Sequence, residues 1–147
     1  MKGNGRMFDK IKNIPSNLKN FYQRGKRGYA DCDVWTMSLW FERTIISMLE
    51  EFKKHKHGYP FGMSSEQWDL ELERMIYYFK ESSDEFCSEK NEYEEEWCNS
   101  LWSDQENQNK EIREKWLQRE DAIAKYQENM KNKGLELFSK YYYDLWD

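Results

Sequence analysis

The chain has 147 residues, enough for one domain with a hydrophobic core and few for two. Charged residues make up 35% and hydrophobic residues 38% of it, but seven Trp, ten Tyr and eight Phe supply large side chains for a core. Each aromatic ring can bury roughly 150–250 Å², so the composition argues against intrinsic disorder. The absence of an apolar run of about 18 residues argues against a membrane-spanning helix, and no apolar region typical of a secretory signal follows the N-terminal lysines.

The net charge of −5 is unevenly distributed along the chain. Residues 1–30 hold eight basic residues and one acidic residue, a net charge of +7. Residues 61–104 hold three basic and thirteen acidic residues, a net charge of −10. One interpretation is a basic arm that contacts nucleic acid or phosphate, or an acidic surface that imitates nucleic acid. The other is a set of solvated helix faces whose charges neutralise one another within the protein or an oligomer.

Residues 1–30 are predicted to form a basic N-terminal arm, and residues 31–147 a helical domain. The arm is expected to hold two short helical turns, one before Pro15 and one across residues 18–22. The stretch 24–28 mixes glycine with basic residues, which predicts a flexible joint.

Asp31 or Asp33 is expected to cap a long helix that ends near His55. Apolar residues recur along it at steps of three and four, which indicates a helix that is apolar over much of its circumference and central to the domain. Gly58 and Pro60 are expected to stop it.

Ser64 and Gln67 form a capping-box pattern that starts a second helix. This helix either continues to Leu101 or breaks at residues 82–84. Together with the first helix it predicts the core, which comprises Trp35, Phe41, Ile45, Met48, Phe52, Trp68, Leu72, Met75 and Phe79.

A third long helix is predicted from about Asp104, with Gly134 as its C-cap. The aromatic segment 135–146 is too apolar to stay in water and should dock on the domain or on another subunit. The predicted fold is therefore all-α, a helical bundle of about three long helices with a basic N-terminal arm and a docked aromatic C-terminal helix. A homo-oligomer is expected from that segment and from the heptad spacing of Trp116, Ile123 and Met130.

Two clusters hold the candidate binding residues, which are Arg24, Lys26, Arg27, Tyr29, Asp31 and Asp33 in the first and His57 and Tyr59 in the second. In the first cluster, the basic side chains can hold a phosphate while Tyr29 stacks on a base. The alternative is a capped helix whose carboxylates pair with Arg27 or Lys26. The two clusters are expected at opposite ends of one helix, about 34 Å apart at roughly 1.5 Å per residue, which favours separate binding surfaces over one active site.

Catalytic and metal-binding signatures are not evident. His57 is the only side chain in its cluster whose ordinary pKa lies near neutral pH, which makes it the only candidate general base there. A histidine in such a loop is more often a cap or a packing contact. Three cysteines without a CxxC spacing argue for reduced thiols. We therefore expect no enzyme activity, no metal and no cofactor.

Part of the sequence resembles a group of small uncharacterised proteins of tailed bacteriophages. The resemblance covers about residues 27–80 and rests on Arg27-Gly28-Tyr29-x-Asp31-x-Asp33-Val34-Trp35, His57-Gly58-Tyr59-Pro60 and Glu66-Gln67-Trp68-Asp69. It implies action in the cytoplasm of a bacterial host, as an accessory protein that binds a host or phage protein or nucleic acid, in host takeover or counter-defence. No membrane partner is expected. The alternative is a small-ligand or nucleotide-binding protein that uses the two clusters.

Overall fold

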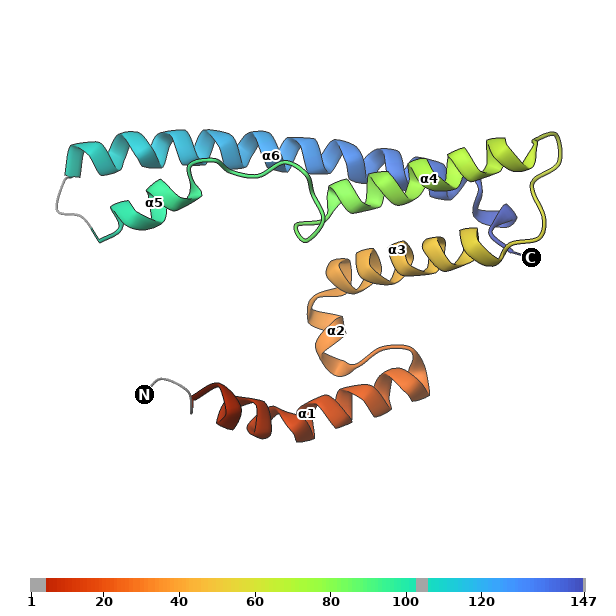
Figure 1. Cartoon of the computed structure of the whole chain (residues 1–147), viewed down its shortest axis with the longest axis horizontal. Helices are drawn as coiled ribbons and strands as arrows, with labels where there is room; N and C mark the ends of the chain where they lie inside the picture. The colour runs from red at the N-terminus through yellow and green to blue at the C-terminus, as the bar shows by residue number, and fades with distance from the viewer. Residues whose placement is uncertain (1–4, 103–105, 147) are drawn as a thin grey trace. The chain divides into compact units, whose positions relative to one another are not determined.

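The computed structural model of the chain describes residues 5–102 and 106–146, and their side chains from residue 16 to 102 and from 109 to 146. Every regular element in these ranges is a helix, so the predicted all-α class is confirmed (Figure 1). The chain divides into two compact units, residues 1–43 and residues 44–147.

The basic segment of the first unit forms one long helix, α1 (Gly5–Arg27), instead of the predicted short turns and flexible joint. This helix ends where Gly28 adopts a φ of +83°, a left-handed conformation that glycine enters at little cost. The Gly28 N–H donates to the carbonyl of Arg24 at 2.9 Å and closes the last turn. Two further helices follow, α2 (Asp31–Trp35) and α3 (Met37–His55).

The predicted continuous helix from Asp33 to His55 is wrong, because the helix is interrupted at Thr36. Thr36 has a φ of −126° and a ψ of 46°, outside the helical region. Its hydroxyl donates to the carbonyl of Cys32 at 3.4 Å, a local bond that competes with the regular helix. Trp35, predicted to lie in the core, directly precedes the break and is 89% exposed.

The second unit contains α4 (Ser65–Ser82), which lies beside the C-terminal half of α6 (Glu106–Lys140) (Figure 1). The short helix α5 (Glu94–Ser100) packs on the other half of α6. The capping box predicted at the start of α4 is confirmed. The Ser64 hydroxyl accepts from the N–H of Gln67 at 3.3 Å, and the Gln67 side chain accepts from the N–H of Ser64 at 2.8 Å.

One stripe of α4 supplies the largest fully buried side chains, Trp68, Leu72, Met75 and Phe79. These four core predictions are confirmed. On α3 the buried residues are Ile46 and Leu49, whereas Met48, also predicted for the core, is 63% exposed. The buried stripe of α3 thus lies one residue, or roughly 100° of helix rotation, from the predicted one. Half-buried positions are taken by the other predicted core residues of α3, Phe41, Ile45 and Phe52.

Gly134 does not cap a helix, in contrast to the prediction, because α6 continues to Lys140. A Cβ atom on Gly134 would lie 3.2 Å from two ring carbons of Phe79. The Phe79 ring is itself 1% exposed and packs edge-on against Phe138, with 6.3 Å between centroids. The glycine therefore allows α4 and α6 to approach closely.

The end of α4 at Ser82 matches the alternative in which the helix breaks at residues 82–84, and the alternative in which it continues to Leu101 is wrong. The irregular chain that follows is held by the buried carboxylate of Glu81, which is 6% exposed. This carboxylate accepts from the N–H and hydroxyl of Ser88, at 3.1 and 2.7 Å, and from the Tyr126 hydroxyl at 3.0 Å. Burial alone would raise the pKa of Glu81, but these hydrogen bonds outweigh burial and lower it.

The C-terminal half of α3 and the aromatic C-terminal segment meet α4 at Trp68. The Phe52 ring packs edge-on against Trp68 at 6.5 Å between centroids, and Tyr141, 7% exposed, packs against the same indole at 5.1 Å. The short 3₁₀ helix η1 (Tyr142–Asp144) follows Tyr141. The aromatic segment therefore docks on its own unit through Tyr141.

Candidate functional site

The first predicted cluster forms the corner between α1 and α2, where Arg24 and Asp33 make a two-point ion pair. The Arg24 Nε donates to one carboxylate oxygen at 2.9 Å and Nη2 to the other at 2.6 Å. The backbone N–H of Ala30 donates to the same carboxylate at 2.7 Å. The hydrogen bonds from Arg24, and next that from Ala30, lower the pKa of Asp33 to about 2. Asp33 thereby fixes the first turn of α2 to the last turn of α1.

A second ion pair in the corner joins Arg27 and Asp31. Arg27 also donates from Nε to the carbonyl of Tyr29 at 3.0 Å, and its guanidinium lies 4.6 Å from the centroid of the Tyr29 ring. Asp31 receives further contacts from Lys19 at 3.2 Å and from the Gln23 amide at 2.7 Å. The hydrogen bonds from Arg27, and next those from Gln23 and Lys19, hold the pKa of Asp31 well below its usual range.

The geometry of the corner matches part of the alternative in which the carboxylates pair with Arg27 or Lys26, because Asp31 pairs with Arg27. Asp33 pairs instead with Arg24, and the N-cap of α2 is Ala30, so the predicted cap at Asp31 or Asp33 is wrong. A nucleotide phosphate would have to displace Asp31 from Arg27, and a base would have to compete with the guanidinium for the face of Tyr29. Lys26 is exposed at the end of α1. The corner therefore links two helices through groups that already satisfy one another's charges.

The second predicted cluster lies in the loop after α3, in the second unit. The loop contains a tight turn in which the Met63 N–H donates to the carbonyl of Pro60 at 3.1 Å. Gly62 occupies the third position of this turn with a φ of +85°, which only glycine adopts easily. Next to His57, the Lys56 side chain is 7% exposed and pairs with Asp69 on α4 at 2.9 Å. These contacts fix the loop that carries His57 and Tyr59.

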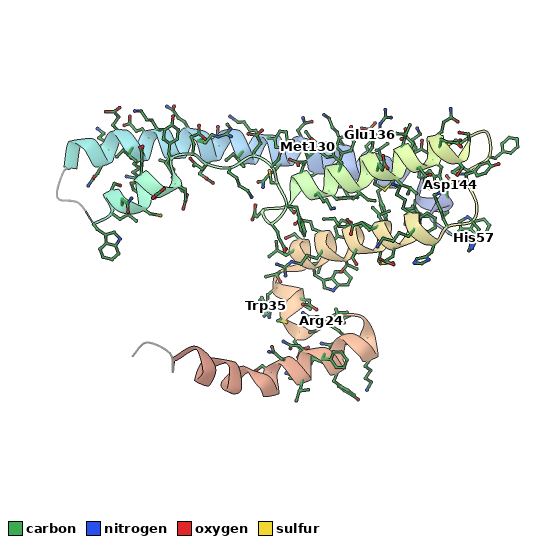
Figure 2. The ribbon with its side chains drawn as sticks, viewed as in Figure 1. Arg24, Trp35, His57, Met130, Glu136 and Asp144 are labelled. Atoms are coloured by element: carbon green, nitrogen blue, oxygen red, sulfur yellow. The ribbon has the colours of Figure 1, made fainter. Side chains whose placement is uncertain are left out.

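Tertiary structure brings this loop against the C-terminal segment. A cavity of about 230 Å³ is lined by Gly58, Tyr59, Pro60, Phe61, Asp144 and Trp146. Figure 2 shows His57 and Asp144 at this same end of the second unit. The sequence analysis missed Asp144 and Trp146 as site residues. The only signal for them was the aromatic character of residues 135–146, which predicted docking but not its place.

The C-terminal segment also lines a second opening. It is an apolar groove of about 350 Å³ lined by Ile45, Met48, Leu49, Phe52, Phe138, Tyr142 and Leu145. Its exposed edges are Met48 and Tyr142, which are 63% and 57% exposed. All seven lining residues are apolar or aromatic, so the groove offers hydrophobic contact with shape and little hydrogen bonding.

The acidic middle of the chain packs on the N-terminal half of α6. Arg119 donates to Glu89 at 2.6 Å and to Glu92 at 2.8 Å, and these two hydrogen bonds, first the one to Glu89, raise the pKa of Arg119. The indoles of Trp97 and Trp116 stack 5.8 Å apart. A shallow cavity of about 520 Å³ beside them is lined mainly by polar and charged groups, among them Glu96 and Lys115. Much of the acidic charge here is therefore used in ion pairs and solvated faces.

The described side chains include no group of three or more His, Cys, Asp or Glu that is placed to hold a metal ion. The three thiols, Cys32, Cys87 and Cys98, are free. Within residues 5–102 and 106–146, no helix combines the length and apolar character needed to cross a bilayer.

Comparison of the chain with protein-family models, with curated proteins and with solved structures finds no match.

Proposed function

We propose that this protein is a non-enzymatic binding protein whose partner surface is the end of the second unit that carries the two openings. The observation that carries the proposal is the apolar groove of about 350 Å³ between α3 and the C-terminal segment. Its rim residue Met48 is 63% exposed, and it lies on a protein in which 35% of the residues are charged. Apolar surface that is concave and open on a strongly polar protein is typical of an interaction site.

The proposed partner is a host or phage protein in the cytoplasm of a bacterial cell, which is the setting that the resemblance of residues 27–80 implies. The proposed working form is a bundle of three long helices, α3, α4 and α6, that presents the C-terminal aromatic segment. Side chains of α3 contact α4 through Phe52 and Trp68 and through the Lys53–Glu73 ion pair at 2.5 Å, which supports this form. A role in host takeover or counter-defence is consistent with a protein that acts by occupying a surface of its partner.

A second copy of the chain is the other proposed occupant of the groove. The oligomer prediction rested partly on the heptad-spaced residues Ile123 and Met130. These residues are 9% and 8% exposed, so they are buried within the unit. The aromatic segment, the other basis of the oligomer prediction, helps to line the groove, which is therefore the proposed surface for self-association. Light scattering on the purified protein distinguishes a monomer of 18.2 kDa from a dimer of twice that mass.

The test of the proposal is affinity capture from phage-infected cells with two matched variants. Met48→Glu places a charge on the groove. Leu101→Glu places the same charge on a residue of similar exposure, 60% against 63%, at the far end of the unit. We expect Met48→Glu to lose a partner that the wild type and Leu101→Glu both retain, while circular dichroism shows the same helix content for all three. Equal recovery of every captured protein by both variants would contradict the proposal.

A further inference from the structure

The cavity between the loop after α3 and the C-terminal segment has a composition that differs from that of the apolar groove. Three aromatic residues, Tyr59, Phe61 and Trp146, line it together with one carboxylate, Asp144. Tyr59 and Trp146 are 58% and 75% exposed, so most of their surface is not used by the core. The cavity holds about 230 Å³, which is the scale of one amino-acid side chain and not of a nucleotide.

Asp144 is the charged group of this cavity. It is half-buried, and its N–H donates to the carbonyl of Tyr141 at 2.9 Å, which fixes it at the end of η1. Among the described residues no cation forms an ion pair with its carboxylate. The lysines that precede the two lining segments in the sequence have other partners: Lys56 pairs with Asp69 at 2.9 Å, and Lys140 lies 4.6 Å from the centroid of the Tyr141 ring.

Aromatic faces and a carboxylate attract the same class of ligand. The ring faces carry negative potential and bind cations, and a carboxylate adds a full negative charge. An anionic ligand would be repelled by Asp144, and a purely apolar one would remove water from its carboxylate without a replacement. Arginine suits such a site better than lysine, because its planar guanidinium both stacks on aromatic rings and donates two hydrogen bonds to one carboxylate.

We propose that this cavity binds the guanidinium of an arginine side chain on the partner protein, with Asp144 as the ion-pair partner and Tyr59 and Trp146 as stacking surfaces. The proposal rests on the proposed function, since it supplies a polar anchor beside the apolar groove. The groove provides contact area, and the cavity selects a partner with an arginine at the matching position.

The test is a titration of the full-length protein, followed by NMR of the tryptophan indole N–H signals, with the Trp146 signal assigned from Trp146→Phe. The probe is a capped Gly-Arg-Gly peptide, and the control is the same peptide with citrulline, which has nearly the same shape and no charge. We expect the arginine peptide to shift the Trp146 signal and the citrulline peptide to leave it unchanged. Asp144→Asn should weaken binding roughly fivefold or more, the factor expected for a lost ion-pair or cation–π contact. Asp121→Asn, which removes a carboxylate paired with Lys125 on α6, should not.

Equal shifts with both peptides, or no shift with the arginine peptide at millimolar concentration, would overturn the inference. The signals of the other tryptophans report whether each variant is folded. If the arginine peptide fails to bind but Met48→Glu still loses its partner, the arginine site is wrong and the proposed function is still supported. Retention of all partners by Met48→Glu would defeat the proposed function whatever the peptides do.

Discussion

Replacing Tyr126 by Phe removes one hydroxyl from the buried carboxylate of Glu81 and leaves the shape of the ring unchanged. Glu81 is 6% exposed and accepts three hydrogen bonds, of which the Tyr126 hydroxyl supplies one at 3.0 Å. A hydrogen bond to a charged group contributes about 1.5–3 kcal/mol to the net free energy of unfolding. Tyr126 is half-buried, so we expect a loss near the lower end, about 1.5 kcal/mol.

This loss should depend on pH in a defined direction. Hydrogen bonding lowers the folded-state pKa of Glu81 below its ordinary value of 4.5, despite burial. A lowered folded-state pKa stabilises the fold above the unfolded-state pKa, and that stabilisation is lost as the pH falls through the folded-state value. Without the Tyr126 donor the folded-state pKa rises. The variant should therefore lose less stability than the wild type on acidification, and the difference between the two should shrink as the pH falls through the folded-state pKa of Glu81.

Urea unfolding followed by circular dichroism, at neutral pH and near pH 4, measures both effects. The matched control is Tyr77→Phe. The Tyr77 hydroxyl lies 3.4 Å from that of Tyr126, and no hydrogen bond joins it to the carboxylate. We expect the control to lose less than about 0.5 kcal/mol. If the two variants lose the same free energy, or if Tyr126→Phe loses less than about 0.5 kcal/mol, the assignment of Glu81 as the group that holds residues 83–88 is incorrect.

Three other perturbations test the fold. Alanine is favoured over glycine by about 1 kcal/mol in a helix interior. Gly25→Ala should therefore raise the melting temperature, because no atom lies within 4 Å of the new Cβ. Gly134→Ala should lower it, because overpacking against Phe79 costs about 1–3 kcal/mol. Asp33→Asn should speed hydrogen exchange of the Ala30 amide, which donates to the Asp33 carboxylate. In the wild type this amide should stay protected from exchange on acidification until the pH approaches about 2, and loss of its protection at a higher pH would contradict the ion pair. In urea unfolding, Trp68→Ala should lower the free energy of unfolding by about 3–5 kcal/mol and Trp35→Ala by less than about 0.5 kcal/mol. A larger loss for Trp35→Ala than for Trp68→Ala would contradict the burial of Trp68 and the exposure of Trp35.

Features that depend on neighbours in the chain were predictable. Ser64 and Gln67 lie three residues apart, and their side chains meet whenever the chain between them turns into a helix, so the capping box follows from the sequence. The pairing of Arg27 with Asp31 is equally local, since the partners are four positions apart in the sequence. The stripe of Trp68, Leu72, Met75 and Phe79 was predictable because its period belongs to the helix itself.

Features that depend on contacts between distant segments were not predictable. The break at Thr36 was missed for a different reason: the apolar pattern on both sides of it is compatible with a continuous helix, and the bond from its hydroxyl to Cys32 is itself local. Gly134 has the sequence context of a C-cap, and only the approach of Phe79 from α4 explains why the helix passes through it.

The candidate site also has parts that the sequence predicted and parts that only the tertiary structure decided. The sequence marked His57 and Tyr59 and the aromatic C-terminal segment as unusual, but as separate features. The meeting of Tyr59 with Asp144 and Trp146 in one cavity was decided by tertiary structure, since it requires Tyr141 to pack on Trp68 and so bring the end of the chain to the loop after α3. Helix periodicity and capping are encoded within a few residues of one another, whereas the meeting of two loops depends on how every helix between them packs.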